Sequence, residues 1–436
     1  MKEKLIDHIA RSLEKHPDIS QWCVRQHREK EFQLFASREA PEEKRTVITQ
    51  SFSVDLYFVE GKHQGKSSFT ILPHEIDGLP GKIESAVNYA KKLPCNRLFF
   101  LPPPQRYRKV AACDRSLLAD PQMNAEALWH GVTRPFRGKK HEKLATCEIF
   151  ITSAVSNIRN SRGLAGSFEE TRLLLDLVVM AQAGENEAES HSESSMRTPR
   201  DFSPEGAVSA LTLSAREKLG ASLPPSGSFP VVLSREALLT LFTPFIFHAS
   251  AAAFDKSLSV FRRGKPAWKG GALKGEGLTV ISDPHIPLGL KSFPFDRDGT
   301  ASKKVRIIDK GIFRNIWAPC EHAEYLRMPP TGAFGNTVVA AGETPMESLL
   351  AEGSEVLHIK EFSHMEPDVT SGNFTGELRL GSWRSRGKSR AVKGGSVSGN
   401  VFEVFSHARF AREPFSMNSY YGPVAIRFES IAVSGA

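Results

Sequence analysis

The chain has 436 residues, with 57 lysines and arginines against 49 aspartates and glutamates, which gives a formal net charge of +8. Hydrophobic residues make up 40% of the chain and charged residues 24%, so the composition excludes wholesale disorder and a fibrous repeat. At roughly 150 residues per domain, this length predicts two or three domains. Because no run of about 18 uninterrupted apolar residues occurs, no membrane-spanning helix and no membrane partner are expected.

The N-terminal residues and the cysteines indicate a cytoplasmic protein. A secretory signal needs about 7–15 apolar residues after a basic end, and the opening sequence MKEKLIDHIA lacks that run. The cysteines are odd in number, widely separated and without a C-x-x-C pair, which is typical of free thiols in a reducing compartment. They are Cys23, Cys95, Cys113, Cys147 and Cys320.

Local patterns in the first part of the chain predict both helices and strands. Apolar residues at helical spacing predict helices over 5–13 and 83–92. Strict alternation of apolar and polar residues over 52–58 predicts a half-buried strand. A turn at 60–65 reverses the chain, and residues 68–72 run back beside that strand. Two further strands are predicted over 145–156 and 171–180.

Composition changes abruptly at residues 184–206, where glutamates stand among Ser, Pro and Arg with almost no large apolar residue. Such a segment predicts an acidic flexible loop or linker. It would separate an N-terminal domain, 1–183, from a C-terminal domain, 207–436. The second domain is predicted to be rich in strands, with helices at 208–219 and 345–351, a strand at 230–233 and a hairpin of 305–308 with 312–317. The predicted class is α+β.

Several short motifs, taken in order, resemble the TldD/PmbA family, and its PmbA (TldE) branch more than its TldD branch. They are NSRG at 160–163, PVVL at 230–233, ISDPH at 281–285, SFPFDRDGT at 292–300, TSGNF at 370–374 and SVSGN at 396–400. The resemblance implies an N-terminal α+β domain, a C-terminal β-rich domain and dimers that enclose a channel. An older description of this family is modulator of DNA gyrase.

The resemblance also implies where a zinc site would lie. TldD-type subunits resemble metalloproteases, with H-E-x-x-x-H on a helix and a cysteine near the C-terminus, whereas PmbA-type subunits lack these ligands and act as partners. Laid on that pattern, this chain has Thr243 and Pro244 where His and Glu would stand, His248 at the next ligand position and Tyr421 instead of the cysteine. Because catalytic zinc needs three protein ligands, no catalytic residue and no metal are expected here.

The expected role of this chain is therefore to bind. His248 has two interpretations: a buried histidine hydrogen-bonded to a backbone carbonyl, or a residue that lines a shared channel and contacts substrate. Thr243, Tyr421 and Asn373 are the other candidates for channel or substrate contact. The resemblance implies an unstructured peptide as substrate and either a heterodimer with a zinc-holding TldD-like subunit or a homodimer.

Metal ligands elsewhere are weaker hypotheses. His358, Glu361 and His364 do not converge on one face at either helical or strand spacing. The run 320–322, Cys-Glu-His, places soft and hard ligands side by side, but solvated or partner-facing polar residues are the favoured interpretation at both places. An alternative function is a self-contained homodimeric metallopeptidase that recruits His248 with other histidines, such as His285 or His322.

Three further segments imitate ligand-binding motifs. The loop 61–67 has too few residues between its glycines for a phosphate loop, and 296–299 lacks the spacing of a calcium loop, so both predict turns. The basic tract 383–390 places Trp383 beside spaced arginines, which allows a DNA- or gyrase-associated binding protein as the other alternative. An exposed cationic loop between two strands is the favoured interpretation, so a nucleic-acid partner is not expected.

Overall fold

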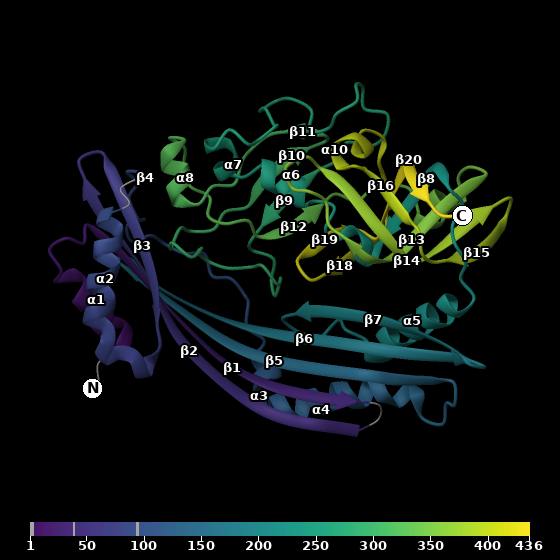
Figure 1. Cartoon of the computed structure of the whole chain (residues 1–436), viewed down its shortest axis with the longest axis horizontal. Coiled ribbons are helices and arrows are strands. Elements are labelled where there is room, and N and C mark those ends of the chain that lie inside the picture. Colours follow the sequence, from purple (N-terminus) through teal and green to yellow (C-terminus); the bar gives the residue numbers. More distant parts are fainter. Residues whose placement is uncertain (1–3, 38–39, 93–95) are drawn as a thin grey trace.

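The computed structural model describes residues 4–37, 40–92 and 96–436. Figure 1 shows two parts: a long curved sheet flanked by helices, and a β-rich part that lies above its concave side. This arrangement confirms the predicted α+β class, with an N-terminal α+β domain and a C-terminal β-rich domain. Cys95 lies outside the described residues, and the other four cysteines are free. Within the described ranges no helix is long and apolar enough to cross a membrane.

The N-terminal domain is built on one antiparallel sheet with the strand order β4-β3-β2-β1-β5-β6-β7. Its strands are β1 (Gln21–Ser37), β2 (Ala40–Glu60), β3 (His63–Ile71), β4 (Asn96–Arg97), β5 (Glu142–Asn160), β6 (Ala165–Ala183) and β7 (Asn186–Met196). The predicted turn at 60–65 is confirmed, because Glu60 pairs with His63 across it. The loop at 61–67 is therefore part of a hairpin.

Helices cover this sheet in two groups, each with its own core. The helices and 3-10 turns are α1 (Leu5–Glu14), η1 (Pro73–Gly78), α2 (Leu79–Lys92), α3 (Arg115–Ala119), α4 (Pro121–Thr133), η2 (Arg134–Phe136) and α5 (Pro204–Leu219). The first core joins α1 and α2 to β1, β2 and β3, and the second joins α3, α4 and α5 to β1, β5 and β6. The sequence patterns predicted α1, α2 and α5 but not α3 or α4.

The prediction of a flexible segment at 184–206 is wrong for most of its length. Residues 186–196 form β7, which pairs with β6 along its whole length, and α5 begins at Pro204. In this strand the exposed positions carry glutamates, while the alternate positions, such as Ser190 and Ser192, face inward. The inward side hydrogen-bonds to the C-terminal domain. Small polar residues therefore stand at positions where a half-buried strand usually has large apolar residues.

The C-terminal domain contains two sheets. The first has the order β11-β10-β9-β12-β19-β18, and the second the order β13-β8-β20-β16-β14-β15, with a β13–β14 pairing that closes it on itself. The first sheet consists of β9 (Val280–Asp283), β10 (Val305–Asp309), β11 (Ile312–Phe313), β12 (Asn336–Val339), β18 (Pro414–Met417) and β19 (Tyr420–Pro423). The second consists of β8 (Gly227–Ser234), β13 (Glu355–Met365), β14 (Asn373–Ser385), β15 (Lys388–Val392), β16 (Ser396–Asn400) and β20 (Ala425–Ser434), with β17 (Arg409–Phe410) beside β20.

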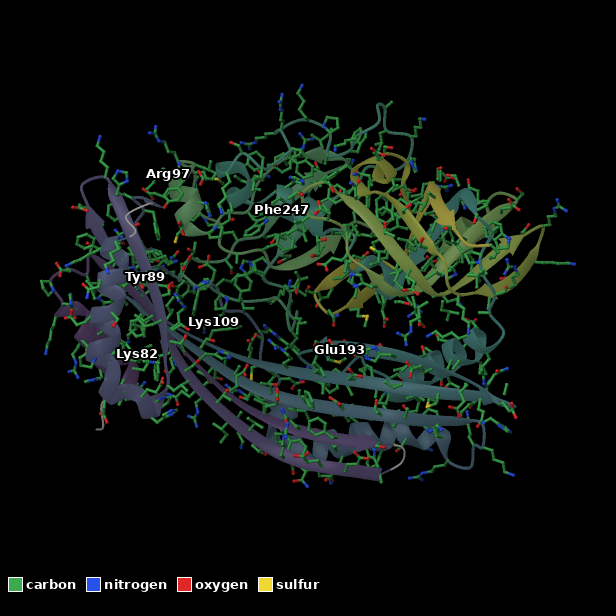
Figure 2. All side chains as sticks on the ribbon, viewed as in Figure 1. Lys82, Tyr89, Arg97, Lys109, Glu193 and Phe247 are labelled. Atoms are coloured by element: carbon green, nitrogen blue, oxygen red, sulfur yellow. The ribbon has the colours of Figure 1, made fainter. Side chains whose placement is uncertain are left out.

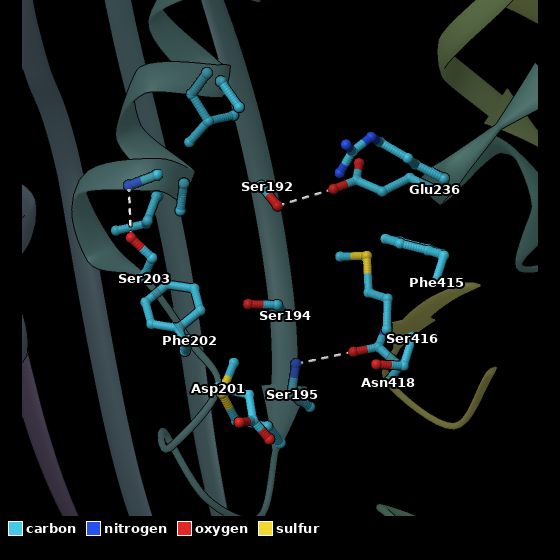
Figure 3. A pocket seen from close by; sticks show the side chains of 18 of the residues that line it. Ser192, Ser194, Ser195, Asp201, Phe202, Ser203, Glu236, Phe415, Ser416 and Asn418 are labelled. Atoms are coloured by element: carbon cyan, nitrogen blue, oxygen red, sulfur yellow. Dashed lines mark hydrogen bonds between the residues drawn. The ribbon is translucent and has the colours of Figure 1, made fainter. Parts of the chain in front are cut away.

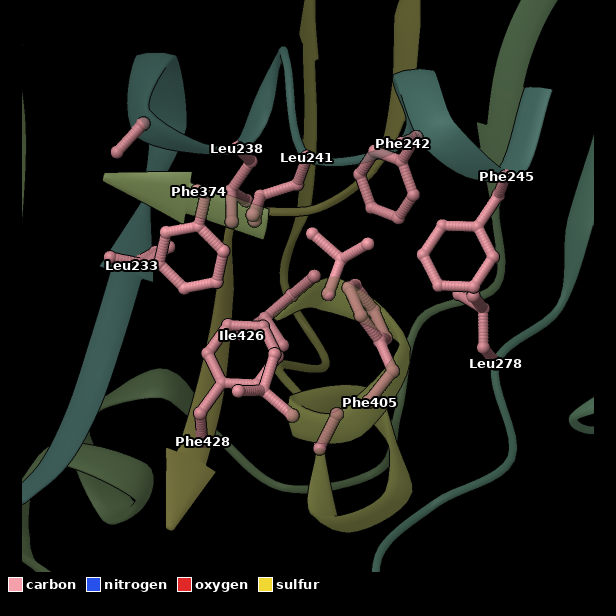
Figure 4. Packing of buried hydrophobic residues seen from close by; sticks show 14 of the residues in the cluster. Leu233, Leu238, Leu241, Phe242, Phe245, Leu278, Phe374, Phe405, Ile426 and Phe428 are labelled. Atoms are coloured by element: carbon pink, nitrogen blue, oxygen red, sulfur yellow. The ribbon is translucent and has the colours of Figure 1, made fainter. Parts of the chain in front are cut away.

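Short helices connect these strands and close over one aromatic core. They are η3 (Arg235–Leu238), α6 (Thr243–His248), α7 (Ala251–Asp255), α8 (Cys320–Tyr325), α9 (Met346–Ala351), α10 (Val401–Val404) and η4 (Phe405–His407). Figure 4 shows the centre of the core, where Phe242 and Phe245 meet Phe405 and Phe428. Phe245 and Phe405 lie edge to face with ring centroids 5.1 Å apart. This packing fixes α6, which carries the position of the expected metal ligand.

Candidate functional site

Pro244 begins helix α6 rather than kinking a longer helix. It stands in the first turn, where a missing N–H removes no hydrogen bond. The next helix, α7, starts separately at Ser250, whose hydroxyl accepts a hydrogen bond from the backbone N–H of Ala253 at 3.1 Å. The segment is thus two short helices, and the chain turns directly after His248.

His248 is fully buried, and both of its ring nitrogens are occupied. Nδ1 accepts a hydrogen bond from the backbone N–H of Val260 at 3.2 Å, so the proton resides on Nε2, which donates to the carbonyl oxygen of Thr370 at 2.9 Å. The rings of Phe261 and Phe402 lie 5.5 and 5.3 Å away. Burial lowers the pKa of His248, so the imidazole is neutral at physiological pH. This is the buried arrangement with a backbone carbonyl partner.

The other candidate residues do not gather into one site with His248. The hydroxyl of Thr243 donates to the carbonyl oxygen of Thr240 at 2.8 Å, as expected near a helix start. Asn373 is exposed, three residues beyond Thr370, and its side-chain oxygen accepts from the amide of Asn400 at 2.8 Å. Thr243 and Asn373 thus both belong to the C-terminal domain, but each is already hydrogen-bonded locally.

Tyr421 lies on the opposite side of its strand from α6. Its neighbour Tyr420 is buried against Phe242, with ring centroids 5.7 Å apart. Because successive side chains of a strand point to opposite faces, Tyr421 points away from α6 and lines a cavity between the domains. Figure 2 shows Phe247 of α6 within the C-terminal domain and Glu193 on β7 of the N-terminal domain below it.

The remaining metal-ligand candidates are engaged elsewhere. On β13, buried His358 contacts the Ser234 hydroxyl at 2.9 Å, and burial lowers its pKa to about 3. Glu361 pairs with Lys218 at 2.6 Å, while His364 is exposed. No group of three residues that could hold a metal ion occurs in the described part of the chain.

The histidines that a self-contained enzyme would recruit also have other contacts. His285 contacts the hydroxyl of Ser302 at 3.0 Å, and His322 contacts the carboxylate of Asp255 at 3.3 Å. Neither contacts His248. The neighbouring residue Cys320 is buried, and burial raises the pKa of its thiol. A thiolate, the form that binds metals, is therefore disfavoured at this position.

The basic tract, expected as a loop between two strands, forms the paired ends of β14 and β15, with only Arg386 and Gly387 in the turn between them. Trp383 is buried against Phe229, with ring centroids 4.8 Å apart, so its ring is not available to stack on a base. Arg384 pairs with Glu347 at 3.6 Å, and Arg390 donates to the carbonyl oxygen of Leu223 at 3.0 Å. These contacts favour the cationic-loop interpretation over nucleic-acid binding.

A cavity of about 950 Å³ lies between the two domains. Its walls come from β7 and the start of α5 on one side, and from η3, β13 and the β18–β19 hairpin on the other. Figure 3 shows two hydrogen bonds that join the walls: Ser192 donates to Glu236 at 2.9 Å, and the N–H of Ser195 donates to the side-chain oxygen of Asn418 at 2.8 Å. The cavity is therefore a fixed feature of how the domains meet.

The cavity is lined by charged residues that differ in their partners. Three basic residues pair with carboxylates: Arg197 with Glu170 at 2.5 Å, Arg200 with Asp114 at 3.7 Å and Lys360 with Glu217 at 2.6 Å. Arg235 forms no ion pair with any described residue, and its guanidinium lies over the ring of Phe415, 5.8 Å from the centroid. Burial raises the pKa of Glu236, whose carboxylate accepts a hydrogen bond from the hydroxyl of Ser192.

Tyr421, a candidate for channel or substrate contact, lines this cavity, and so does Glu361, which was considered only as a metal ligand. Arg235 has φ 54°, a left-handed conformation that favours glycine, and nothing in the local sequence predicts it. The serine-rich sequence of β7, taken without its surroundings, is typical of a loop rather than a strand. The one local pattern that helps to locate Arg235 is the hydrophobic strand β8, because η3 begins directly after that strand ends.

Comparisons with known proteins agree with this fold. The family model described as "PmbA/TldA metallopeptidase C-terminal domain" matches residues 226–435. A protein named "Metalloprotease PmbA homolog" from Buchnera aphidicola (Acyrthosiphon pisum) is 28% identical over 134 residues, which is 30% of this chain and 30% of that protein. A "Metalloprotease TldD homolog" from the same organism is 24% identical over 230 residues, 49% of this chain and 46% of that protein.

The match to a solved structure extends over the whole fold. The crystal structure of TldE from Thermococcus kodakarensis superimposes with a TM-score of 0.84 and covers 99% of this chain and 100% of that one. At 18% identity this similarity shows the shared fold alone. The two Buchnera relatives, in contrast, are matched over less than half of their length.

Proposed function

Since the chain belongs to the TldD/PmbA family, we propose that it is a PmbA/TldE-like subunit of a zinc metalloprotease complex and holds no zinc of its own. In this proposal a TldD-like partner supplies the zinc, which activates water for peptide hydrolysis. This chain binds the unstructured peptide, and the complex is cytoplasmic. A homodimer of this chain would be a peptide-binding form without hydrolytic activity.

The observation that carries the metal-free assignment is the hydrogen bonding of His248. A metal ligand needs an imidazole nitrogen with a free lone pair, and the only one, on Nδ1, accepts the N–H of Val260. The neighbouring positions of the expected motif hold Thr243 and Pro244, which provide neither an imidazole nor a general base. Binding zinc through Nδ1 would require breaking the hydrogen bond that Val260 donates to a fully buried ring.

The peptide-binding role is supported by two strand edges beside the interdomain cavity. β7 stands at the edge of the N-terminal sheet, and β18 at the edge of the sheet that contains β19. The two strands contact each other next to the cavity. An extended peptide binds such edges through backbone hydrogen bonds, which suits a substrate without fixed structure.

Reconstitution tests the proposal. The chain is purified alone and together with a TldD-like protein that carries an intact H-E-x-x-x-H, and each sample is incubated with an unstructured peptide. We expect the two proteins to co-purify and cleavage only in the presence of both, abolished by a zinc chelator. Cleavage by this chain alone, with stoichiometric zinc, would contradict the proposal and favour a self-contained enzyme.

A further inference from the structure

Arg235 is the one arginine or lysine of the interdomain cavity that has no acidic partner in the described part of the chain. The other arginines and the lysine that line the cavity each pair with a carboxylate, whereas Arg235 has only an aromatic ring beside it among the described residues. The geometry points to a carboxylate-binding site at Arg235, which would hold an acidic group of a bound peptide. This inference rests on the proposed peptide-binding function and adds to it the chemistry that is recognised.

The backbone at Arg235 holds its side chain in an unusual direction. Its φ of 54° is disfavoured for any residue with a Cβ, and its N–H donates to the carbonyl oxygen of Val424 at 2.9 Å, which keeps that conformation. Glycine or asparagine would adopt this turn more readily. A strained residue kept at the wall of a cavity suggests a functional role for its side chain.

The neighbours of Arg235 orient its guanidinium but do not occupy its N–H donors. Phe415 lies under it at 5.8 Å, and stacking on a ring leaves the N–H donors free because they lie in the guanidinium plane. A guanidinium presents these donors as a fork that matches the two oxygens of a carboxylate. The adjacent acid, Glu236, hydrogen-bonds to Ser192 across the domain boundary instead.

The surroundings favour an extended peptide as the molecule that carries this carboxylate. Phe415 belongs to the edge strand β18, so a chain paired with that edge would pass beside Arg235. The volume of about 950 Å³ is at the upper end of typical ligand sites. Tyr421 and Asn418 add polar groups to the same space. The carboxylate can come from the C-terminus of the peptide or from an acidic side chain.

Fluorescence anisotropy with three labelled peptides tests the inference on the full-length chain. All three are unstructured eight-residue Gly/Ser/Ala peptides: one with a free C-terminal carboxylate, one amidated, and one amidated with a single internal glutamate. The test variant is Arg235→Asn, because asparagine tolerates the left-handed backbone. The matched control is Arg386→Asn, which replaces an exposed arginine with φ 49° on the β14–β15 turn, away from the cavity.

We expect the wild-type chain to bind at least one carboxylate peptide about tenfold tighter than the neutral amide, and the peptide preferred identifies the source of the carboxylate. Arg235→Asn should remove this preference, and Arg386→Asn should keep it. Equal binding of all three peptides to wild-type protein would overturn the carboxylate site but leave the proposed function standing. Failure of every peptide to bind, with or without a TldD-like partner, would overturn both.

Discussion

Two regions of this molecule differ in whether their polar side chains have partners within the protein. Around His248 the C-terminal core surrounds one imidazole with aromatic rings and satisfies both of its nitrogens. Along the boundary between the domains, polar and charged side chains meet across a cavity, and Arg235 is left without an acidic partner. At the position that resembles the family's zinc site the imidazole is buried and hydrogen-bonded, whereas at the boundary charged side chains line a cavity.

The role of a residue at a motif position can therefore be judged only together with its contacts. His248 stands where a zinc ligand would be expected, yet it is buried with both ring nitrogens hydrogen-bonded to backbone groups. Arg235 belongs to no motif, yet it combines a strained backbone, a free cation and access to a cavity. The two regions should therefore respond differently to substitution.

The largest effect is expected in the aromatic core. Phe245 is buried against the rings of Phe402 and Phe405, so Phe245→Ala should lower the free energy of unfolding by about 3–5 kcal/mol. Phe415→Ala, at the half-buried cavity wall, should lower it by under about 2 kcal/mol, because less contact is lost. Chemical denaturation followed by circular dichroism measures both. Similar losses for the two variants would remove the distinction between core and boundary.

The next effect concerns the ion pair behind the cavity. Lys218 of α5 is buried and reaches Glu361 of β13 at 2.6 Å, with a further contact to Ser190 of β7 at 3.2 Å. Lys218→Met should lower the free energy of unfolding by roughly 3 kcal/mol, because it leaves the Glu361 carboxylate uncompensated. Replacing Glu361 by Met in the same chain should restore part of the loss.

Lys360→Met is the matched control for that pair. Lys360 pairs with Glu217 at 2.6 Å, but both side chains are 29% exposed. Water screens such a pair, so the variant should lose under about 1 kcal/mol. A loss as large as that of Lys218→Met would show that burial does not set the strength of these contacts.

A smaller, pH-dependent effect is expected at Asp296. Burial and the nearby Asp298 raise the pKa of the Asp296 carboxyl to about 7, and its Oδ2 has no hydrogen-bond partner. The folded state therefore holds a proton that the unfolded chain releases near pH 4, so this group makes wild-type stability fall between about pH 4 and pH 7. The cost is complete above pH 7.

Asp296→Asn removes the ionisable group and keeps an oxygen to accept the backbone N–H groups of Asp298 and Thr300. The variant should gain about 1–3 kcal/mol over wild type at pH 8, and the gain should shrink towards pH 5. Thermal unfolding at several pH values measures this difference. A constant difference across this range would contradict the raised pKa.

The smallest effect is expected at the basic hairpin. Neutralising Arg384, Arg386 and Arg390 together to Gln should leave DNA binding weak and unchanged, because two of these residues have partners and Trp383 is buried. Binding to a duplex is followed at several salt concentrations. Tight, steeply salt-dependent binding that the triple variant loses would support the DNA-associated alternative instead.

Much of the fold could be predicted from the sequence wherever the signal is local. Helix α1 follows from its apolar spacing, and the turn at 160–163 follows from Asn160, whose side chain accepts the N–H groups of Arg162 and Leu164. Helix α4 had a usable signal that was missed: Asp120 caps it and accepts the N–H of Met123, with a proline at its first position.

The rest depends on contacts between domains, which no local pattern encodes. β7 has serines on its inner side because it faces polar groups of the C-terminal domain, so it lacks the apolar alternation of a strand. Of the four candidate contact residues, Tyr421 alone lines the cavity. The free charge of Arg235 becomes visible only when its surroundings are known.

The most direct test of the central claim is the zinc content of the purified chain after incubation with excess zinc and removal of loosely bound ions. Mass spectrometry should find under about 0.1 equivalent per chain, with no change in His248→Ala, because the only imidazole at the expected position is already hydrogen-bonded on both nitrogens. One equivalent of zinc in the wild-type chain, lost in His248→Ala, would contradict the account.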